Sequence, residues 1–240
     1  MNIAHRRRIR PGKSRIPLVL TGLTTVILLI AVLWGCLGGG RTTPLPFQYT
    51  LEYPSPRPAD LTPLGVVLKV ERFASAQGIN NVSMIYRPRP YRYDAYPYHY
   101  WRVRPRDLVT DFLLRDLKHS GLFKAVLSYQ DAQDARFVVQ GAVTECSARY
   151  EAQDVQRAVL SLDLTLLDVS EKEITKQVVF GKRYEAAAAM ANRSPEALAQ
   201  GISASMEILA PEILRDILRA IRERPGVSPI PAVTDRSGSR

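Results

Sequence analysis

The chain has 240 residues and a formal net charge of +10, with 46% hydrophobic and 23% charged residues. This length allows one domain with extra segments, and the composition excludes a disordered chain, a collagen-like chain and a multi-span membrane protein. Six basic side chains lie within the first fifteen residues, so the remaining chain carries 27 basic against 23 acidic residues, and this mild excess argues against a nucleic-acid-binding polycation.

An export signal is the first predicted element. The basic stretch is followed by nineteen uncharged and mostly apolar residues, Ile16 to Trp34, which is the order of regions in a signal peptide. Residues 33–36 read LWGC and resemble a bacterial lipobox, in which the cysteine thiol is acylated and the preceding peptide is removed. We therefore predict that residues 1–35 are a signal peptide and that Cys36 is the lipidation site. The alternative is an uncleaved signal anchor in the inner membrane, because nineteen helical residues span about 28 Å.

Either form of this segment places the rest of the chain outside the cytoplasm, because the basic end of such a segment stays inside. Residue 37 is Leu, whereas Asp at this position retains many lipoproteins at the inner membrane. By resemblance to that sorting rule, we expect the protein at the periplasmic face of the outer membrane, attached through its lipid. Acylation of Cys36 would leave Cys146 as the only thiol, which predicts a buried cysteine without a disulfide.

A tether, one domain and a tail follow the signal. Residues 36–64 are rich in Gly and Pro and predict a tether. The domain is expected at 65–224, and the breaker-rich residues 225–240 predict a disordered tail. Hydrophobic periodicity and helix-boundary signals predict strands at 66–70, 82–87, 98–103, 135–150, 157–167 and 173–185, and helices at 105–120 and 194–224.

The fold class follows from these elements. Alternation of apolar and polar residues is strongest from Arg157 to Leu167, and a long apolar stripe marks one face of the last helix. Two helices and six or seven strands joined by short turns predict an α+β two-layer sandwich, in which a mostly antiparallel sheet is covered by two helices.

Catalytic and metal-binding motifs are missing from the sequence. It holds three histidines and two cysteines, and it contains no HExxH, CxxC or GxSxG pattern. We therefore expect no enzyme activity, no cofactor and no metal site.

One segment has an unusual composition, Tyr86 to Arg106, which holds six of the eleven tyrosines among several arginines. Tyr, Trp and Arg are the residues that dominate interface hot spots, and they also suit lipid head groups. Nucleic acid is disfavoured by export. The alternative is a surface hairpin without a binding role. The candidate partner-binding residues are Tyr86, Tyr91, Tyr93, Tyr96, Tyr98, Trp101 and Arg102.

Two stretches resemble a known family. They are FQYTLEYPSP from Phe47, and MIYRPRPYRYDAYPYHYWRVRPRDLVTDFLLRDLKHSGLFKAV from Met84. Together with the lipobox they resemble the ABC-type transport auxiliary lipoproteins of the PqiC type. The residues that match the family pattern are Tyr49, Leu51, Tyr98, Trp101, Pro105, Gly121, Phe123 and Val126. The order of elements agrees over about residues 47–220.

This resemblance implies an α/β sandwich lipoprotein of the Gram-negative periplasm. Such a protein would assist an ABC transporter whose substrate-handling component carries a mammalian-cell-entry domain, with phospholipid or a related apolar molecule as cargo. The implied partners are this transporter complex and the membrane, and self-association into a homo-oligomer is a further option. A different class of function is a cell-envelope assembly or structural lipoprotein with no transport role.

Overall fold

Nine strands form one sheet in the part of the chain that the structure, a computed structural model, describes, residues 44–58, 60–151 and 155–229. The predicted signal peptide, Cys36 and residues 230–240 lie outside this part. The strands are β1 (Phe47–Tyr49), β2 (Leu64–Val70), β3 (Ala74–Ser75), β4 (Ser83–Arg89), β5 (Arg92–Trp101), β6 (Phe123–Ser128), β7 (Phe137–Tyr150), β8 (Gln156–Asp168) and β9 (Val178–Ala189). The helices are α2 (Pro105–His119), α3 (Ile174–Gln177) and α4 (Pro195–Arg222), with a 3-10 helix η1 (Gln77–Ile79).

The sheet is mixed, which corrects the prediction of a mostly antiparallel one. Strand β7 pairs in parallel with β2, β3 and β4 and antiparallel with β8, and β8 pairs antiparallel with β9. Two further parallel pairs are β1 with β5 and β2 with β6. Short turns make neighbours in sequence antiparallel, whereas the parallel partners β4 and β7 are joined by a longer connection that includes α2.

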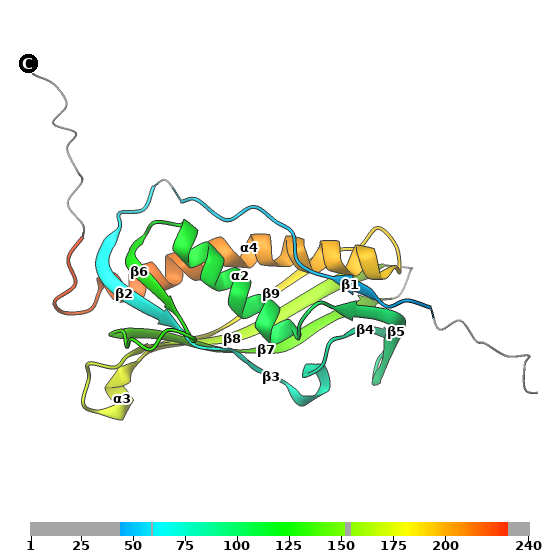
Figure 1. Cartoon of the computed structure of the whole chain (residues 1–240), viewed down its shortest axis with the longest axis horizontal. Helices are drawn as coiled ribbons and strands as arrows, with labels where there is room; N and C mark the ends of the chain where they lie inside the picture. Colours follow the sequence, from blue (N-terminus) through cyan, green and yellow to red (C-terminus); the bar gives the residue numbers. More distant parts are fainter. Residues whose placement is uncertain (1–43, 59, 152–154, 230–240) are drawn as a thin grey trace, which may run out of the picture. The chain divides into compact units, whose positions relative to one another are not determined.

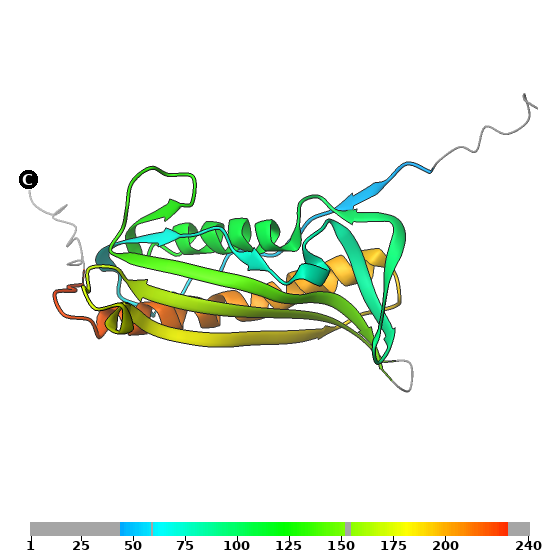
Figure 2. The same ribbon diagram turned by 90° about the horizontal axis from the view of Figure 1, so that it is seen from below.

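Two long helices cover one face of this curled sheet, as the two ribbon views show (Figures 1 and 2). The helix predicted at 105–120 is confirmed as α2, which begins at Pro105 and is followed by Gly121 at φ +66°. The helix predicted at 194–224 is confirmed as α4. Its first turn is capped because the Ser194 hydroxyl accepts a hydrogen bond of 3.1 Å from the amide of Ala197.

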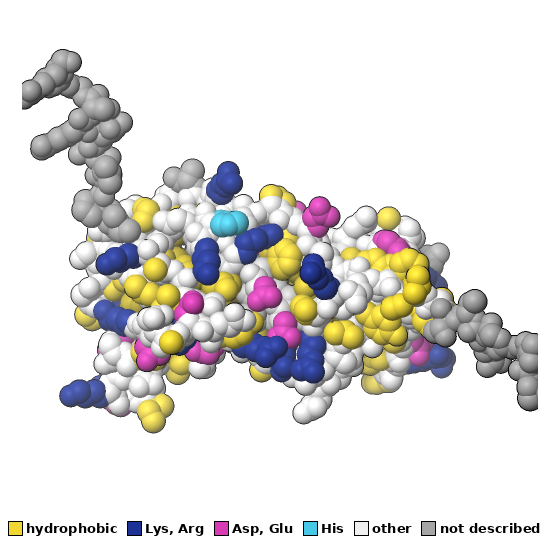
Figure 3. All heavy atoms as spheres, in the orientation of Figure 1, with side chains coloured by type: hydrophobic (Ala, Val, Ile, Leu, Met, Phe, Trp, Pro, Cys, Tyr) yellow, Lys and Arg dark blue, Asp and Glu magenta, His cyan; other side chains and the backbone are white. Residues whose placement is uncertain are grey.

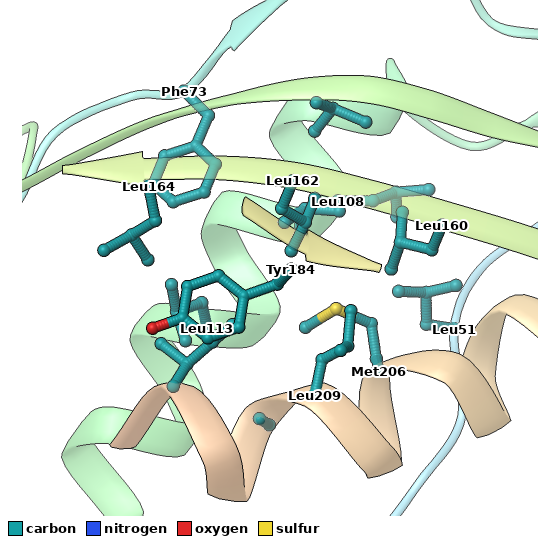
Figure 4. Close-up of a cluster of buried hydrophobic side chains, with 14 of the residues drawn as sticks. Leu51, Phe73, Leu108, Leu113, Leu160, Leu162, Leu164, Tyr184, Met206 and Leu209 are labelled. Carbon is teal, nitrogen blue, oxygen red and sulfur yellow. The ribbon is translucent and has the colours of Figure 1, made fainter. Parts of the chain in front are cut away.

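The core lies between the sheet and these two helices. Leu160, Leu162 and Leu164 point from β8 toward the helices and are at most 1% exposed (Figure 4). They face Met206 and Leu209 of α4, which are equally buried. The alternation that predicted this strand is confirmed, because every second residue of β8 belongs to the core.

The folded part begins before residue 65, the predicted start of the domain. Strand β1 pairs with β5, and Leu51 and Tyr53 are 3% and 8% exposed. The phenol of Tyr53 donates a hydrogen bond of 2.6 Å to the buried carboxylate of Asp116 in α2. Prolines exclude helix and central strand in this stretch, but they do not prevent an extended segment from packing on the helices.

The domain also extends beyond its predicted end at 224. The amide of Gly65 in β2 donates to the carbonyl of Ser228 at 3.1 Å, and Leu64 pairs with Pro229. Residues 225–229 are therefore held against β2, whereas the rest of the predicted tail lies outside the described residues.

Candidate interaction surface

The aromatic and arginine-rich segment forms a β-hairpin, which corrects the prediction of two short strands flanking a loop. Strands β4 and β5 are antiparallel, and Arg89 pairs with Arg92 across a connection made of Pro90 and Tyr91. Tyr91 has φ +66°, in the left-handed region that favours glycine, and its side chain is fully exposed. The hairpin therefore carries an aromatic ring at its tip, where a turn ordinarily has a glycine.

Two of the predicted binding residues are part of the core. Trp101 is 1% exposed and Tyr96 is 9% exposed. The Tyr96 hydroxyl hydrogen-bonds to that of Tyr150, and burial is the largest cause that raises the pKa of Tyr96 above its usual value. Tyr86, which is half-buried, joins the same cluster with ring centroids 4.7 Å from Tyr96 and 5.2 Å from Tyr150. These rings support the hairpin from inside.

The remaining predicted residues lie at the surface. Tyr93 and Tyr98 are 56% and 44% exposed, and Arg102 is exposed as well. Tyr98 has φ +64° and lies where the pairing of β4 with β5 shifts register. An irregular backbone at this point turns the Tyr98 side chain outward, and such bulges commonly re-aim side chains next to functional sites.

Sequence reasoning missed the contribution of β1 to this surface. Phe47 is 58% exposed, and its ring stacks on His99 of β5 with centroids 5.1 Å apart. Of the large hydrophobic side chains that are exposed in the described residues, Leu45, Phe47, Val82, Tyr91, Tyr93, Tyr98 and Val103 belong to β1, the β4–β5 hairpin or the residues next to them. Hydrophobic side chains gather at this end of the domain (Figure 3). Because contiguous apolar patches are typical of interaction sites, this end of the domain is the candidate interaction surface.

A hydrogen-bond network of Tyr49, His99 and Glu196 holds β1 in place. The Tyr49 hydroxyl lies 2.8 Å from Nδ1 of His99 and 2.5 Å from a carboxylate oxygen of Glu196 in the first turn of α4. Burial, followed by the Glu196 carboxylate, raises the pKa of Tyr49 to about 12. This network joins β1, the hairpin and α4, and it therefore fixes the position of Phe47 on the surface.

Further features of the described part of the chain concern metal ligands, the cysteine and membrane-spanning helices. Among residues 44–58, 60–151 and 155–229, no group of three His, Cys, Asp or Glu side chains could hold a metal. Cys146 is buried as predicted, and burial raises the pKa of its thiol to about 12, which leaves it unreactive. No helix within these ranges combines the length and apolar content of a membrane span.

Comparison with known families tests the family resemblance that the sequence motifs indicated. A family model described as ABC-type transport auxiliary lipoprotein component matches residues 49–214. The chain belongs to this family. The family is a transport auxiliary component rather than an enzyme family, and its members are lipoproteins. A search of the curated proteins gave no match.

Solved structures share the fold of this auxiliary lipoprotein. Protein XCC0632 from Xanthomonas campestris, of family DUF330, is similar with a TM-score of 0.63 at 20% identity, over 73% of this chain and 96% of that chain. An uncharacterized protein has a TM-score of 0.56 at 14% identity, over 72% and 99% of the two chains. Both similarities are to nearly complete domains, so the described unit is the whole fold of these relatives.

Proposed function

We propose that this protein is a non-catalytic lipoprotein that is tethered through Cys36 and assists an ABC transporter in moving lipid or another apolar molecule across the cell envelope. Its place is the periplasmic face of the outer membrane, and its docking partner is the transporter component that carries a mammalian-cell-entry domain. The observation that carries the proposal is the family match over residues 49–214. The exposed rings of Phe47, Tyr91 and Tyr98 add a surface that is suited to a protein partner.

The tether restricts where this surface can work. Phe47 is eleven positions after Cys36, and a fully extended chain of that length spans at most about 40 Å. The end of the domain that carries β1 and the hairpin therefore stays near the membrane to which Cys36 is attached. A partner that reaches this membrane from the transporter would meet the exposed rings first.

The lipid anchor is tested by replacing Cys36 with Ser. We expect this change to abolish labelling with a radioactive or clickable fatty acid and to release the protein from the membrane fraction, because the thiol is the acyl acceptor. Acyl labelling that survives the substitution would contradict the anchor.

The docking surface is tested with a triple variant, Phe47→Ser, Tyr91→Ser and Tyr98→Ser. An aromatic hot spot contributes about 2 kcal/mol or more to an interface, and a single hot spot among these three rings is enough for a tenfold effect. We therefore expect capture of the entry-domain component from detergent-solubilised envelope to fall at least about tenfold. The matched control is Ile174→Ser, Val178→Ser and Ile208→Ser, which removes exposed apolar side chains elsewhere.

Equal capture by both triple variants and the wild type, with unchanged melting curves, would show that the transporter docks elsewhere. Normal lipid movement in a strain that lacks the gene would favour the structural lipoprotein instead.

A further inference from the structure

An apolar slot opens on the sheet face that the helices leave uncovered, which is the face seen in Figure 2. Its volume is about 310 Å³, and its apolar walls are Ala76 and Ile79 at η1, Ile85 of β4 and Tyr93 of β5. Strand β7 contributes Glu145 and Ser147. The amide of Ala76 donates to the Val143 carbonyl of β7 at 3.0 Å, so η1 is attached to the sheet as a fixed wall.

Two arginines lie next to this slot along β4, and one of them, Arg87, already interacts electrostatically with Glu145 in the slot. A second hollow of about 400 Å³ is lined by Arg87, Arg89 and Arg149, and also by Glu151, whose carboxylate lies 3.5 Å from the guanidinium of Arg157. Arg87 pairs with Arg149 in the register of β4 and β7. Arg149 is bound to the carboxylate of Glu145. In contrast, neither Arg87 nor Arg89 forms an ion pair within the described ranges, and the Nε of Arg87 is buried without a hydrogen-bond partner there. Since a buried polar group without a partner is costly, this position favours an acceptor from outside the chain.

Tyr93 connects the slot with the positive charge. The Arg87 guanidinium lies 5.1 Å from the centroid of the Tyr93 ring, and the same ring lines the slot. The one carboxylate in the slot, that of Glu145, already accepts hydrogen bonds from Arg149 and Ser147. The slot thus has an apolar interior and a cationic mouth.

This arrangement matches an amphiphile with a negative head group. We propose that the uncovered face binds an anionic phospholipid, with one acyl chain in the slot between η1 and Tyr93 and the phosphate on Arg87 and Arg89. The volume is near the lower limit of about 300–1,000 Å³ for ligand pockets, which suits one chain rather than two. Guanidinium groups suit phosphate because they can donate two parallel hydrogen bonds. The inference rests on the proposed transport function and adds that this domain itself binds the lipid, at this slot and with a preference for a negative head group.

The test uses the full chain in nanodiscs of phosphatidylcholine, without detergent. The probe is a lysophosphatidylglycerol that carries a diazirine in its acyl chain and is added below its micelle concentration. After illumination, mass spectrometry locates the adducts. We expect them on the peptides that contain Ile79, Ile85 and Tyr93, and we expect at least about fivefold less labelling with the zwitterionic lysophosphatidylcholine probe.

Two variants test the positive charge and the apolar slot separately. Arg87→Gln with Arg89→Gln should lower labelling at least fivefold with an unchanged melting curve, and Ile85→Trp should lower it by filling the slot. The matched control is Arg57→Gln with Arg215→Gln, two exposed arginines on other parts of the domain, which should label like the wild type.

Three results would overturn the proposal. They are full labelling of the Arg87 and Arg89 variant, adducts spread over the whole surface as expected for a bilayer contact, and displacement of the probe by inorganic phosphate as effectively as by unlabelled lipid. Capture of the transporter component is not measured here, so this test and the docking test can fail separately.

Discussion

At the scale of single residues, the most tightly held charge is Asp168 at the end of β8. Its carboxylate is fully buried and accepts hydrogen bonds from Arg136 at 3.0 and 2.8 Å and from Arg224 at 3.3 Å. The Arg136 guanidinium is the largest cause that holds the pKa of Asp168 far below its usual value. A single carboxylate therefore connects the sheet to the residues that follow α4.

We predict that Asp168→Asn lowers the free energy of unfolding by about 1.5 to 3 kcal/mol at neutral pH, the usual loss for hydrogen bonds to a charged group. Because the folded pKa is depressed, this stabilisation is present above the unfolded pKa of about 3.9 and is lost as the pH falls below it. Urea unfolding between neutral pH and acid should give a steep decline below about pH 4 for the wild type and a flatter one for the variant. Parallel curves would contradict this linkage.

At the scale of elements, the contact between α4 and β8 depends on a missing side chain. A Cβ at Gly201 in α4 would lie 2.4 Å from the Cβ of Ala158 in β8, closer than real carbon contacts. Helix and sheet can approach each other here only because position 201 has no side chain.

We predict that Gly201→Ala destabilises the domain, although alanine favours a helix by about 1 kcal/mol over glycine. Overpacking a core costs about 1 to 3 kcal/mol. The Cβ of Ala158 is bonded directly to the backbone, so it cannot rotate out of the way. Thermal melting should show a lower midpoint than that of the wild type. The control is Gly181→Ala in β9, where the nearest atom to a new Cβ would be 3.8 Å away; a higher midpoint for Gly201→Ala would disprove the clash.

At the scale of the whole domain, the segment before β2 binds the two helices together. Tyr53 and Ser55 donate hydrogen bonds to Asp116 of α2, and the amide of Glu52 donates to the hydroxyl of Ser203 in α4 at 3.0 Å. Figure 1 shows this segment running along the helices between β1 and β2. The residues that resemble a tether are therefore a structural part of the domain.

This arrangement predicts that a chain beginning at residue 65 is less stable than one beginning at residue 45. Deletion of residues 45–64 removes the buried side chains of Leu51 and Tyr53 and leaves Asp116 without two hydroxyl donors. Burial of each such side chain contributes about 1.5 to 3 kcal/mol, so the loss should exceed about 3 kcal/mol. Denaturant unfolding of the two chains measures this difference, and equal midpoints would place the domain boundary at 65 after all.

Local patterns in the sequence were sufficient for α2, α4 and β8, because each depends on periodicity and caps within a short stretch. The burial of Cys146 followed from its being the only thiol left after acylation of Cys36. The composition of the segment from Tyr86 to Arg106 identified it as the candidate surface. The parallel pairing of β4 with β7 depends on contacts between residues far apart in the sequence. A period of two indicates that a segment is a strand, but it does not indicate which strand lies beside it. The same holds for the site. Only the tertiary structure buries Trp101 and Tyr96, adds Phe47 to the surface and brings Arg87 beside the slot formed by Ile79 and Tyr93. The physical reason is that the exposure of a residue is decided by the segments that pack against it.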